Sequence, residues 1–261
     1  MGVDVIIQEG KEHIAKSSFK SRSFTAPDGS DLFLHIPRNV EQLRAAWEVL
    51  KDYTKRIAPN PESVSQDVDP FNKVKSYHSD KDLGYLVFTL VNSAGKPVAV
   101  APAEILSVSD LVDGKTAKGK GIGFIYQGAH TPEISNNDND FSVLTKLYRA
   151  VSSLLPQIST YERDKCLGVV VESRSKGPEL SAIRRAGFND LVPNEHYRPP
   201  AVQKAKRREN QFTEDLVLLE RDVPKDPKLR RLVAEAYVRA AYCEGQDINP
   251  TLRLMGKHFS K

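Results

Sequence analysis

Residues 121–188 follow an order of elements that constrains the fold more than any other part of the chain. The order is a short apolar strand at Gly121–Gly128, a polar loop at Ala129–Asp140, a helix at Phe141–Leu155, a buried strand at Leu167–Val171 and a second helix at Pro178–Ala186, closed by Gly187-Phe188. A helix between two apolar strands predicts an α/β or α+β arrangement. The junction between the first strand and its helix is where many such proteins bind a phosphate-bearing cofactor.

Further strands and helices are predicted on both sides of this segment. Strands are expected at Asp31–Ile36, Gly84–Val91, Pro97–Val108 and Leu216–Glu220, and helices with one apolar face at Val40–Tyr53 and Lys228–Cys243. Pro102 interrupts the third of these strands, which predicts an edge position, a bulge or an early end. We divide the chain into an N-terminal extension (1–30), a main domain (31–223) and a C-terminal helix with its tail (224–261).

Composition limits the classes of protein that the chain can belong to. Of its 261 residues 28% are charged, and no apolar run reaches the roughly 18–20 residues that span a bilayer. The N-terminus lacks the pattern of a signal peptide. The two cysteines, Cys166 and Cys243, suit a reducing compartment. We therefore expect a cytoplasmic protein that does not enter a membrane.

The net charge of +4 leaves a nucleic-acid-associated function open. The segments Lys204–Arg208 and Lys115–Lys120 concentrate basic side chains, which can bind phosphates. The aromatic residues that alternate with basic ones in an RNA-binding sheet are missing around them. A solvated surface loop is the simpler interpretation of both segments.

Taken in order, these features resemble the GNAT superfamily of acyl-coenzyme A-dependent N-acyltransferases across Leu32–Val223. The matching features are the hairpin Gly84–Val108, the strand and helix that follow it, Pro132-Glu133 in the loop between them, the pair Gly187-Phe188 and the closing strand Leu216–Glu220. The resemblance implies a mixed central sheet whose central strands splay apart, flanked by helices. The C-terminal helix is an addition that could pack on the same domain or on another subunit.

The resemblance also implies a reaction and a cofactor site. The expected reaction is direct transfer of an acyl group, such as the acetyl group of acetyl-CoA, to an amine of a small molecule or protein, in a ternary complex and without a metal. Backbone groups of Tyr126, Gln127 and Gly128 would hold the pantetheine arm of coenzyme A. The pyrophosphate would lie at the start of the central helix, on Asn136, Asn137, Asn139 and Phe141.

The loop before this helix departs from the family pattern. The family has Arg or Gln, two variable residues, Gly, a variable residue and then Gly or Ala, whereas Ile134–Asp140 has neither glycine nor arginine. Asp138 and Asp140 would repel a pyrophosphate, although Asn tolerates left-handed backbone and could replace glycine there. We expect Asp140 to be the N-cap of the helix. A calcium site at the two aspartates is a weaker reading, because the other oxygen ligands of a calcium loop are absent.

Candidate acid and base residues follow from the same resemblance. The family often has a tyrosine as general acid four residues before the glycine, where this chain has Ile183. Tyr126 and Tyr148 carry the nearest hydroxyls, but neither stands at the motif position. A general base near the splayed strands needs a carboxylate or an imidazole, and the candidates are Glu104, His130, Glu133 and Glu172. For each of them, a polar residue at the exposed end of a strand is the simpler alternative.

Two functions of different kinds therefore remain open beside the enzyme. The absence of the glycines, the arginine and the tyrosine favours a catalytically inactive binding or regulatory module of the same fold. A nucleic-acid-associated basic protein is the other. The acceptor is not specified by the sequence; the segment His196–Gln211 is a candidate for part of its site only by position.

Overall fold

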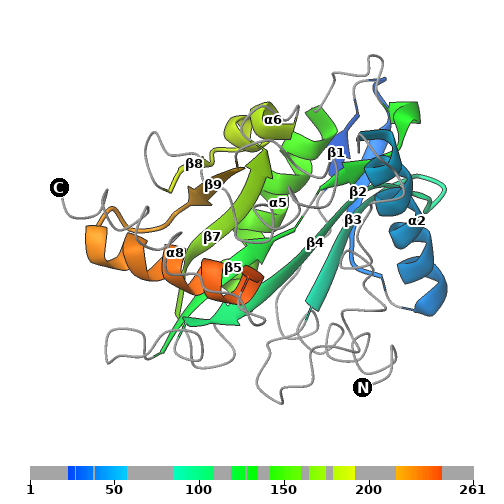
Figure 1. Cartoon of the computed structure of the whole chain (residues 1–261). Helices are drawn as coiled ribbons and strands as arrows, with labels where there is room; N and C mark the ends of the chain where they lie inside the picture. The colour runs from blue at the N-terminus through cyan, green and yellow to red at the C-terminus, as the bar shows by residue number, and fades with distance from the viewer. Residues whose placement is uncertain are drawn as a thin grey trace, which may run out of the picture.

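The computed structural model describes residues 23–26, 28–37, 39–57, 85–108, 119–126, 128–134, 142–159, 165–174, 179–191 and 216–242. These residues form one mixed nine-stranded sheet with helices on both faces (Figure 1). The strands are β1 (Ser23–Thr25), β2 (Asp31–His35), β3 (Tyr85–Asn92), β4 (Pro97–Ser107), β5 (Lys120–Ile125), β6 (Ala129–His130), β7 (Lys165–Arg174), β8 (Asn189–Asp190) and β9 (Leu216–Arg221). The helices are α2 (Val40–Ile57), the short 3-10 helix η3 (Pro132–Ile134), α5 (Ser142–Ser159), α6 (Glu179–Arg185) and α8 (Pro227–Tyr242).

The strand order is β1-β2-β3-β4-β5-β7-β9-β8, with β6 paired to β4. Neighbours are antiparallel except for β5 and β7, which are parallel because α5 connects them as a crossover helix. Figure 1 shows α8 in front of the sheet and α5 behind it. The basic segment Lys204–Arg208, most of Lys115–Lys120 and the segment His196–Gln211 lie outside the described residues.

The two faces of the sheet carry different sets of apolar side chains. Ile125, Val169 and Val171 belong to the larger core, which includes α5 and α2. Phe124 and Val170, which alternate with them, belong to a second cluster with α8. The Phe124 ring packs edge-on against Tyr237 of α8, with the ring centroids 5.0 Å apart.

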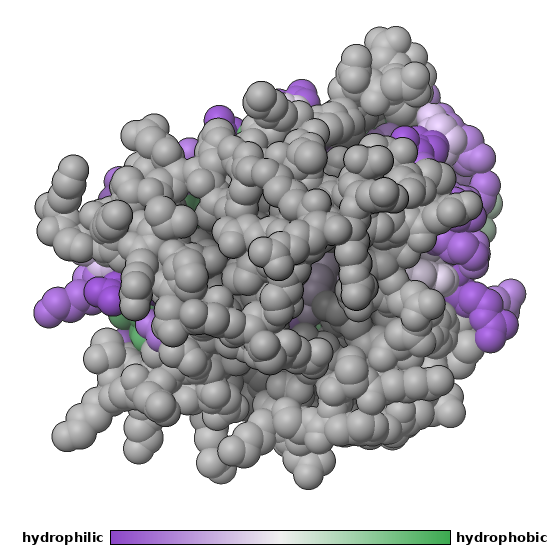
Figure 2. All heavy atoms as spheres, in the orientation of Figure 1, coloured by the Kyte–Doolittle hydropathy of each residue, from purple (hydrophilic) through white to green (hydrophobic). Residues whose placement is uncertain are grey.

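Helix α5, predicted at Phe141–Leu155, buries one apolar stripe. Its members Val143, Leu144, Leu147, Ala150, Val151 and Leu154 are all buried. The outward side of α2 is polar instead, as the hydrophilic residues at the right edge of Figure 2 show. Amphipathic spacing thus correctly predicted which face of α5 packs on the sheet.

The helix end at Gly187-Phe188 also matches the prediction. Gly187 has φ 96°, the left-handed conformation that glycine adopts without steric cost. Its N–H donates to the Arg184 carbonyl at 2.9 Å, and the Phe188 N–H donates to the Ile183 carbonyl at 3.3 Å. The buried Phe188 side chain covers the end of α6, as expected for this kind of helix termination.

Pro102 lies at a bulge, one of the three outcomes predicted for it. It is not at an edge, because β4 pairs with β3 on one side and with β5 and β6 on the other. The register pairs Ala103 with Ile125 but Val100 with Ala129, so two residues of β4 face three on the other side. Pro102 has no N–H to donate there, and its carbonyl accepts a hydrogen bond from the Tyr126 N–H at 2.9 Å.

The two parallel strands separate at this bulge. β5 pairs with β7 from Lys120 opposite Lys165 up to Ile125 opposite Val171. Beyond Ile125 the chain stays with β4 through β6, whereas β7 continues to Arg174 beside β9. In the described part of the sheet, no strand pairing joins β6 to β7. The predicted fold class, a mixed sheet with splayed central strands flanked by helices, is therefore confirmed.

Some element boundaries differ from the predictions. β5 ends at Ile125 rather than at Gly128, because the bulge opposite Pro102 interrupts its pairing. The first strand, β1, lies within residues 1–30, and it pairs antiparallel with β2. α8 packs against the sheet through Val233, Ala236 and Tyr237. The three-segment division of the chain remains a prediction.

Candidate functional site

The candidate site is the gap between β6 and β7, beside α5. Successive residues of a strand point their backbone groups to opposite sides. The Thr131 N–H donates to the Val98 carbonyl of β4 at 2.9 Å, so the backbone groups of His130 point away from β4. The Gly128 N–H also points away from β4, toward α5.

The hydroxyl of Tyr148, on α5, is hydrogen-bonded to the backbone N–H of Gly128 on this side of the strand. The Gly128 N–H donates to the Tyr148 hydroxyl oxygen at 2.8 Å, and the tyrosine is buried. A β-carbon at position 128 would lie 2.7 Å from that oxygen and 2.8 Å from the ring carbon that bears it. A glycine is therefore required for this close approach between helix and strand.

Arg56, near the end of α2, is hydrogen-bonded to a second backbone group of this strand, the carbonyl of His130. Its Nη2 donates to the His130 carbonyl. The guanidinium carbon lies 5.3 Å from the centroid of the Tyr53 ring, a cation–π arrangement. The Tyr53 ring in turn contacts the His130 ring, with centroids 5.2 Å apart. Side chains from α2 and α5 thus converge on two backbone groups of the same strand.

His130 is buried, and its ring has a defined hydrogen-bond partner. Nδ1 lies 2.9 Å from the carbonyl oxygen of Thr131. Because a carbonyl oxygen only accepts, Nδ1 carries the proton in this arrangement and the lone pair of the neutral ring is on Nε2. The imidazole therefore has the tautomer that a general base with Nε2 as the basic atom requires.

The two tyrosines beside the gap remain protonated in the neutral pH range. Burial raises the pKa of Tyr148 well above its ordinary value, and the negative charge of Glu179 raises it further. The pKa of Tyr53 is raised by burial and then by the negative charge of Glu179. Both hydroxyls can donate or accept hydrogen bonds, but neither is a base at neutral pH.

Glu104 and Tyr126 lie in contact on the face of the sheet that carries α8. Glu104 is buried on β4, opposite Phe124 of β5. The Tyr126 hydroxyl donates to Glu104 Oε1, and the rings of Phe124 and Tyr126 pack with centroids 4.3 Å apart. Glu172 follows Val171, the last β7 residue that pairs with β5, so Glu172 also stands where the strands separate.

The structure places the other predicted residues differently. Glu133 is exposed on η3 and forms an ion pair with Lys96 of the β3–β4 turn, with an N–O distance of 3.3 Å. The cofactor positions Gln127, Asn136, Asn137, Asn139 and Phe141 lie outside the described residues.

Sequence reasoning missed the roles of Tyr53, Arg56 and Glu179 and gave Tyr148 no partner. A tyrosine beside an apolar helical stripe is a usable signal, because a buried hydroxyl needs a hydrogen-bond partner. Which strand supplies that partner depends on tertiary structure, and no local pattern specifies it.

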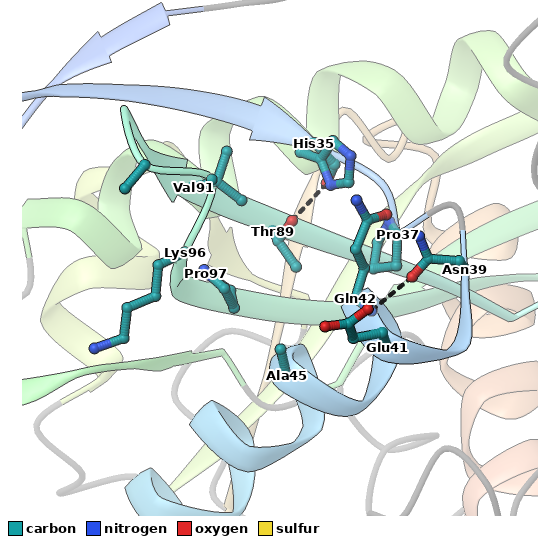
Figure 3. A pocket seen from close by; sticks show the side chains of 12 residues that line it. His35, Pro37, Asn39, Glu41, Gln42, Ala45, Thr89, Val91, Lys96 and Pro97 are labelled. Carbon is teal, nitrogen blue, oxygen red and sulfur yellow. Dashed lines mark hydrogen bonds between the residues drawn. The ribbon is translucent and has the colours of Figure 1, made fainter.

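A separate hollow of about 390 Å³ opens at the start of α2 (Figure 3). Its lining comes from β2, the start of α2, β3 and the β3–β4 turn, and includes His35, Gln42 and Thr89. The Asn39 side chain already accepts from the Gln42 N–H at 2.9 Å, and the Thr89 hydroxyl donates to the His35 carbonyl at 2.9 Å. Figure 3 shows Lys96 extending away from the other labelled side chains. The Asn39 side chain and the Thr89 hydroxyl are thus already bonded to backbone groups beside the hollow.

The described ranges contain neither a candidate metal site nor a candidate membrane span. No three His, Cys, Asp or Glu side chains gather there in an arrangement that could hold a metal ion. None of the described helices is both long enough and apolar enough to span a bilayer.

Comparison with known proteins gives matches only among solved structures. No protein-family model and no curated protein sequence matches this chain. A spermidine N-acetyltransferase from Vibrio cholerae in complex with CoA and spermine is similar, at 12% identity over 73% of this chain and 94% of its own, with a TM-score of 0.45. Arabidopsis thaliana NAA60 in complex with acetyl-CoA is also similar, at 16% identity over 73% of this chain and 97% of its own, with a TM-score of 0.41. A GNAT-family acetyltransferase from Listeria monocytogenes is similar at 9% identity over 77% of this chain and 100% of its own, with a TM-score of 0.42.

Proposed function

We propose that this protein is an acyl-CoA-dependent N-acyltransferase that transfers an acetyl or other acyl group directly to an amine in a ternary complex. The observation that carries the proposal is the separation of the parallel strands beyond Ile125 and Val171. It directs backbone groups of Gly128 and His130 away from β4, into a gap beside α5. An extended cofactor that pairs with a strand edge needs this kind of opening.

The cofactor would lie along the gap and end near the carboxylates. Tyr126 and Gly128 would flank its pantetheine arm, and the segment before α5, with Asn136, Asn137 and Asn139, would receive its pyrophosphate. The amine nitrogen attacks the thioester carbonyl carbon, the new C–N bond forms as the C–S bond breaks, and coenzyme A leaves as the thiol after it takes up a proton.

Glu104, His130 and Glu172 are the candidates for the base that deprotonates the amine. Glu104 is the first choice, because it is held by the Tyr126 hydroxyl beside the point where the strands separate. His130 offers Nε2 as its basic atom in the tautomer described above. Glu133, which is exposed and paired with Lys96, is the weakest of the four predicted candidates.

Titration with acetyl-CoA tests the proposal. A ligand that binds only the native state raises the free energy of unfolding, by about 2.7 kcal/mol at a concentration a hundred times its Kd. We expect a rise in melting temperature with acetyl-CoA and, with a panel of polyamines, amino acids and peptides, release of free thiol in at least one mixture. Failure to bind at millimolar acetyl-CoA would refute the proposal.

A catalytically inactive module of the same fold is the second candidate. It is favoured by Ile183 at the position of the expected tyrosine and by the side chains that already bond to Gly128 and His130. This candidate predicts that acetyl-CoA binds without release of thiol for any amine in the panel. The wild-type panel separates the two cases; if thiol is released, the Glu104→Gln variant should abolish the release and leave the binding affinity for acetyl-CoA unchanged.

A further inference from the structure

We propose that Tyr148 and Arg56 are two caps that close the strand edge in the gap, so that an extended, amide-bearing ligand must replace their hydrogen bonds in order to bind. The inference rests on the proposed function, because the ligand it concerns is the pantetheine arm of the acyl-CoA. It adds a regulatory property to the same site: the gap is closed in the absence of ligand.

An open strand edge recruits extended chains through its backbone groups. Unpaired N–H and C=O groups that point in the same direction form a template for another strand or for a peptide-like ligand. The Gly128 N–H and the His130 carbonyl point in the same direction, two residues or about 7 Å apart along the strand, and neither is bonded to another strand in the described residues. A ligand with a carbonyl and an amide N–H at a similar spacing could therefore bond to both.

Both groups are occupied by side chains from outside the sheet. The Tyr148 hydroxyl accepts from the Gly128 N–H at 2.8 Å, and the Arg56 guanidinium donates to the His130 carbonyl. Each cap has the hydrogen-bonding character that the ligand would need at the same position. A ligand that binds there consequently exchanges one hydrogen bond for another and gains less affinity from each.

The two caps differ in how easily they move. Tyr148 is buried within α5, and its ring lies 6.4 Å from the ring of Phe188. Arg56 has an exposed side chain one residue before the end of α2, held over the face of Tyr53. An exposed arginine can turn into solvent, where water replaces its bonds. Arg56 is therefore the cap that opens first, and Tyr148 the one that restricts the width of the gap.

Three variants of the full-length chain test the inference. Tyr148→Phe keeps the ring and removes the oxygen, and Arg56→Met keeps an unbranched side chain over Tyr53 and removes the donors. Arg44→Met is the matched control, because Arg44 is an exposed arginine on the same helix. Binding of pantetheine and of acetyl-CoA is measured by calorimetry. Pantetheine has the amides of the arm but no phosphate, so its affinity does not depend on the charge of Arg56.

We expect Tyr148→Phe and Arg56→Met each to bind pantetheine about two- to tenfold more tightly than the wild type, the range for one competing hydrogen bond. Arg44→Met should bind as the wild type does. In the free Tyr148→Phe protein, the Gly128 amide should exchange with deuterium faster than in the wild type.

Unchanged or weaker pantetheine binding by both variants would overturn the inference and show that the two contacts only tie α2 and α5 to the strand. The proposed function is judged separately. It fails if acetyl-CoA binds to none of the four proteins, whereas acetyl-CoA binding without tighter pantetheine binding removes only the inference. If only Tyr148→Phe and Arg56→Met bind pantetheine, the inference is supported even if acetyl-CoA does not bind.

Discussion

Arg230 of α8 takes part in a buried ion pair, and its replacement by methionine should be strongly destabilising. Its Nη1 lies 3.0 Å from Glu220 Oε1, and the two side chains are only 13% and 8% exposed. Its Nη2 also donates to the carbonyls of Leu191 at 2.7 Å and Asp190 at 2.9 Å. Methionine fills a similar volume but leaves the carboxylate and both carbonyls without this donor. Removing one partner of a buried pair costs about 3–5 kcal/mol.

Urea unfolding followed by far-UV circular dichroism measures this loss. For a chain of this size, each kcal/mol corresponds to about 2–4 °C in melting temperature, so the variant should melt about 6–20 °C below the wild type. Arg184→Met is the matched control. Arg184 pairs with Asp190 at the same distance of 3.0 Å, but its side chain is 51% exposed. Exposed pairs contribute about 0–1 kcal/mol, so the control should remain within 1 kcal/mol of the wild type.

Similar losses of stability in Arg230→Met and Arg184→Met would refute this reasoning, because burial would then not determine how much an ion pair contributes to stability.

A double variant, Arg230→Met with Glu220→Leu, provides a second check. It removes the uncompensated charge and should recover most of the stability. A deficit of about 1 kcal/mol should remain, since the Val223 N–H loses Glu220 Oε2, its acceptor at 3.1 Å.

Two further predictions concern Gly168 and the buried tyrosines. Gly168→Ala should lower the free energy of unfolding, measured with urea, by about 3 kcal/mol or more. The reason is that Gly168 has φ 146° and that a β-carbon there would lie 2.6 Å from the Val223 backbone nitrogen. Gly95→Ala is the control and should cost less, because the space around Gly95 is open. The raised pKa values of Tyr53 and Tyr148 should leave stability unaffected below pH 10 and reduce it above, where the unfolded chain loses these protons first. Above pH 10 the free energy of unfolding should fall by about 1.4 kcal/mol per pH unit for each tyrosine. Tyr148→Phe should remove the contribution of one of the two tyrosines to this slope.

The fold was predictable from the sequence where the signals are local and repeated. The apolar stripe of α5 spans several turns, and Gly187, two residues beyond the last residue of α6, is a usual sequence signal for the end of a helix. The edge strands β1 and β8 were not predicted. They have three and two residues, too few for a period-two pattern to stand out from the surrounding turns. Such strands depend on the neighbour that pairs with them.

Two candidate residues selected from the sequence lie in contact, but the other contacts around the gap could not be predicted. Glu104 and Tyr126 were both selected from the sequence, for separate roles, and the register of β4 against β5 and the chain that follows it brings their side chains together. The caps could not be found in this way. Tyr148 lies 20 residues from Gly128, and Arg56 lies 74 residues from His130. Contacts across such separations follow from packing of whole helices on the sheet.

The bulge opposite Pro102 also determines which backbone groups face the gap. In a regular strand, residues 126, 128 and 130 would all point toward β4, because Tyr126 does so through its bond to Pro102. The one-residue shift between the pairs Ala103–Ile125 and Val100–Ala129 reverses this alternation. Gly128 and His130 therefore point into the gap, and the only residue type that admits the Tyr148 ring stands at the first of these positions. The bulge at Pro102 of β4 thus determines which backbone groups lie on the far edge of the neighbouring β5–β6 segment.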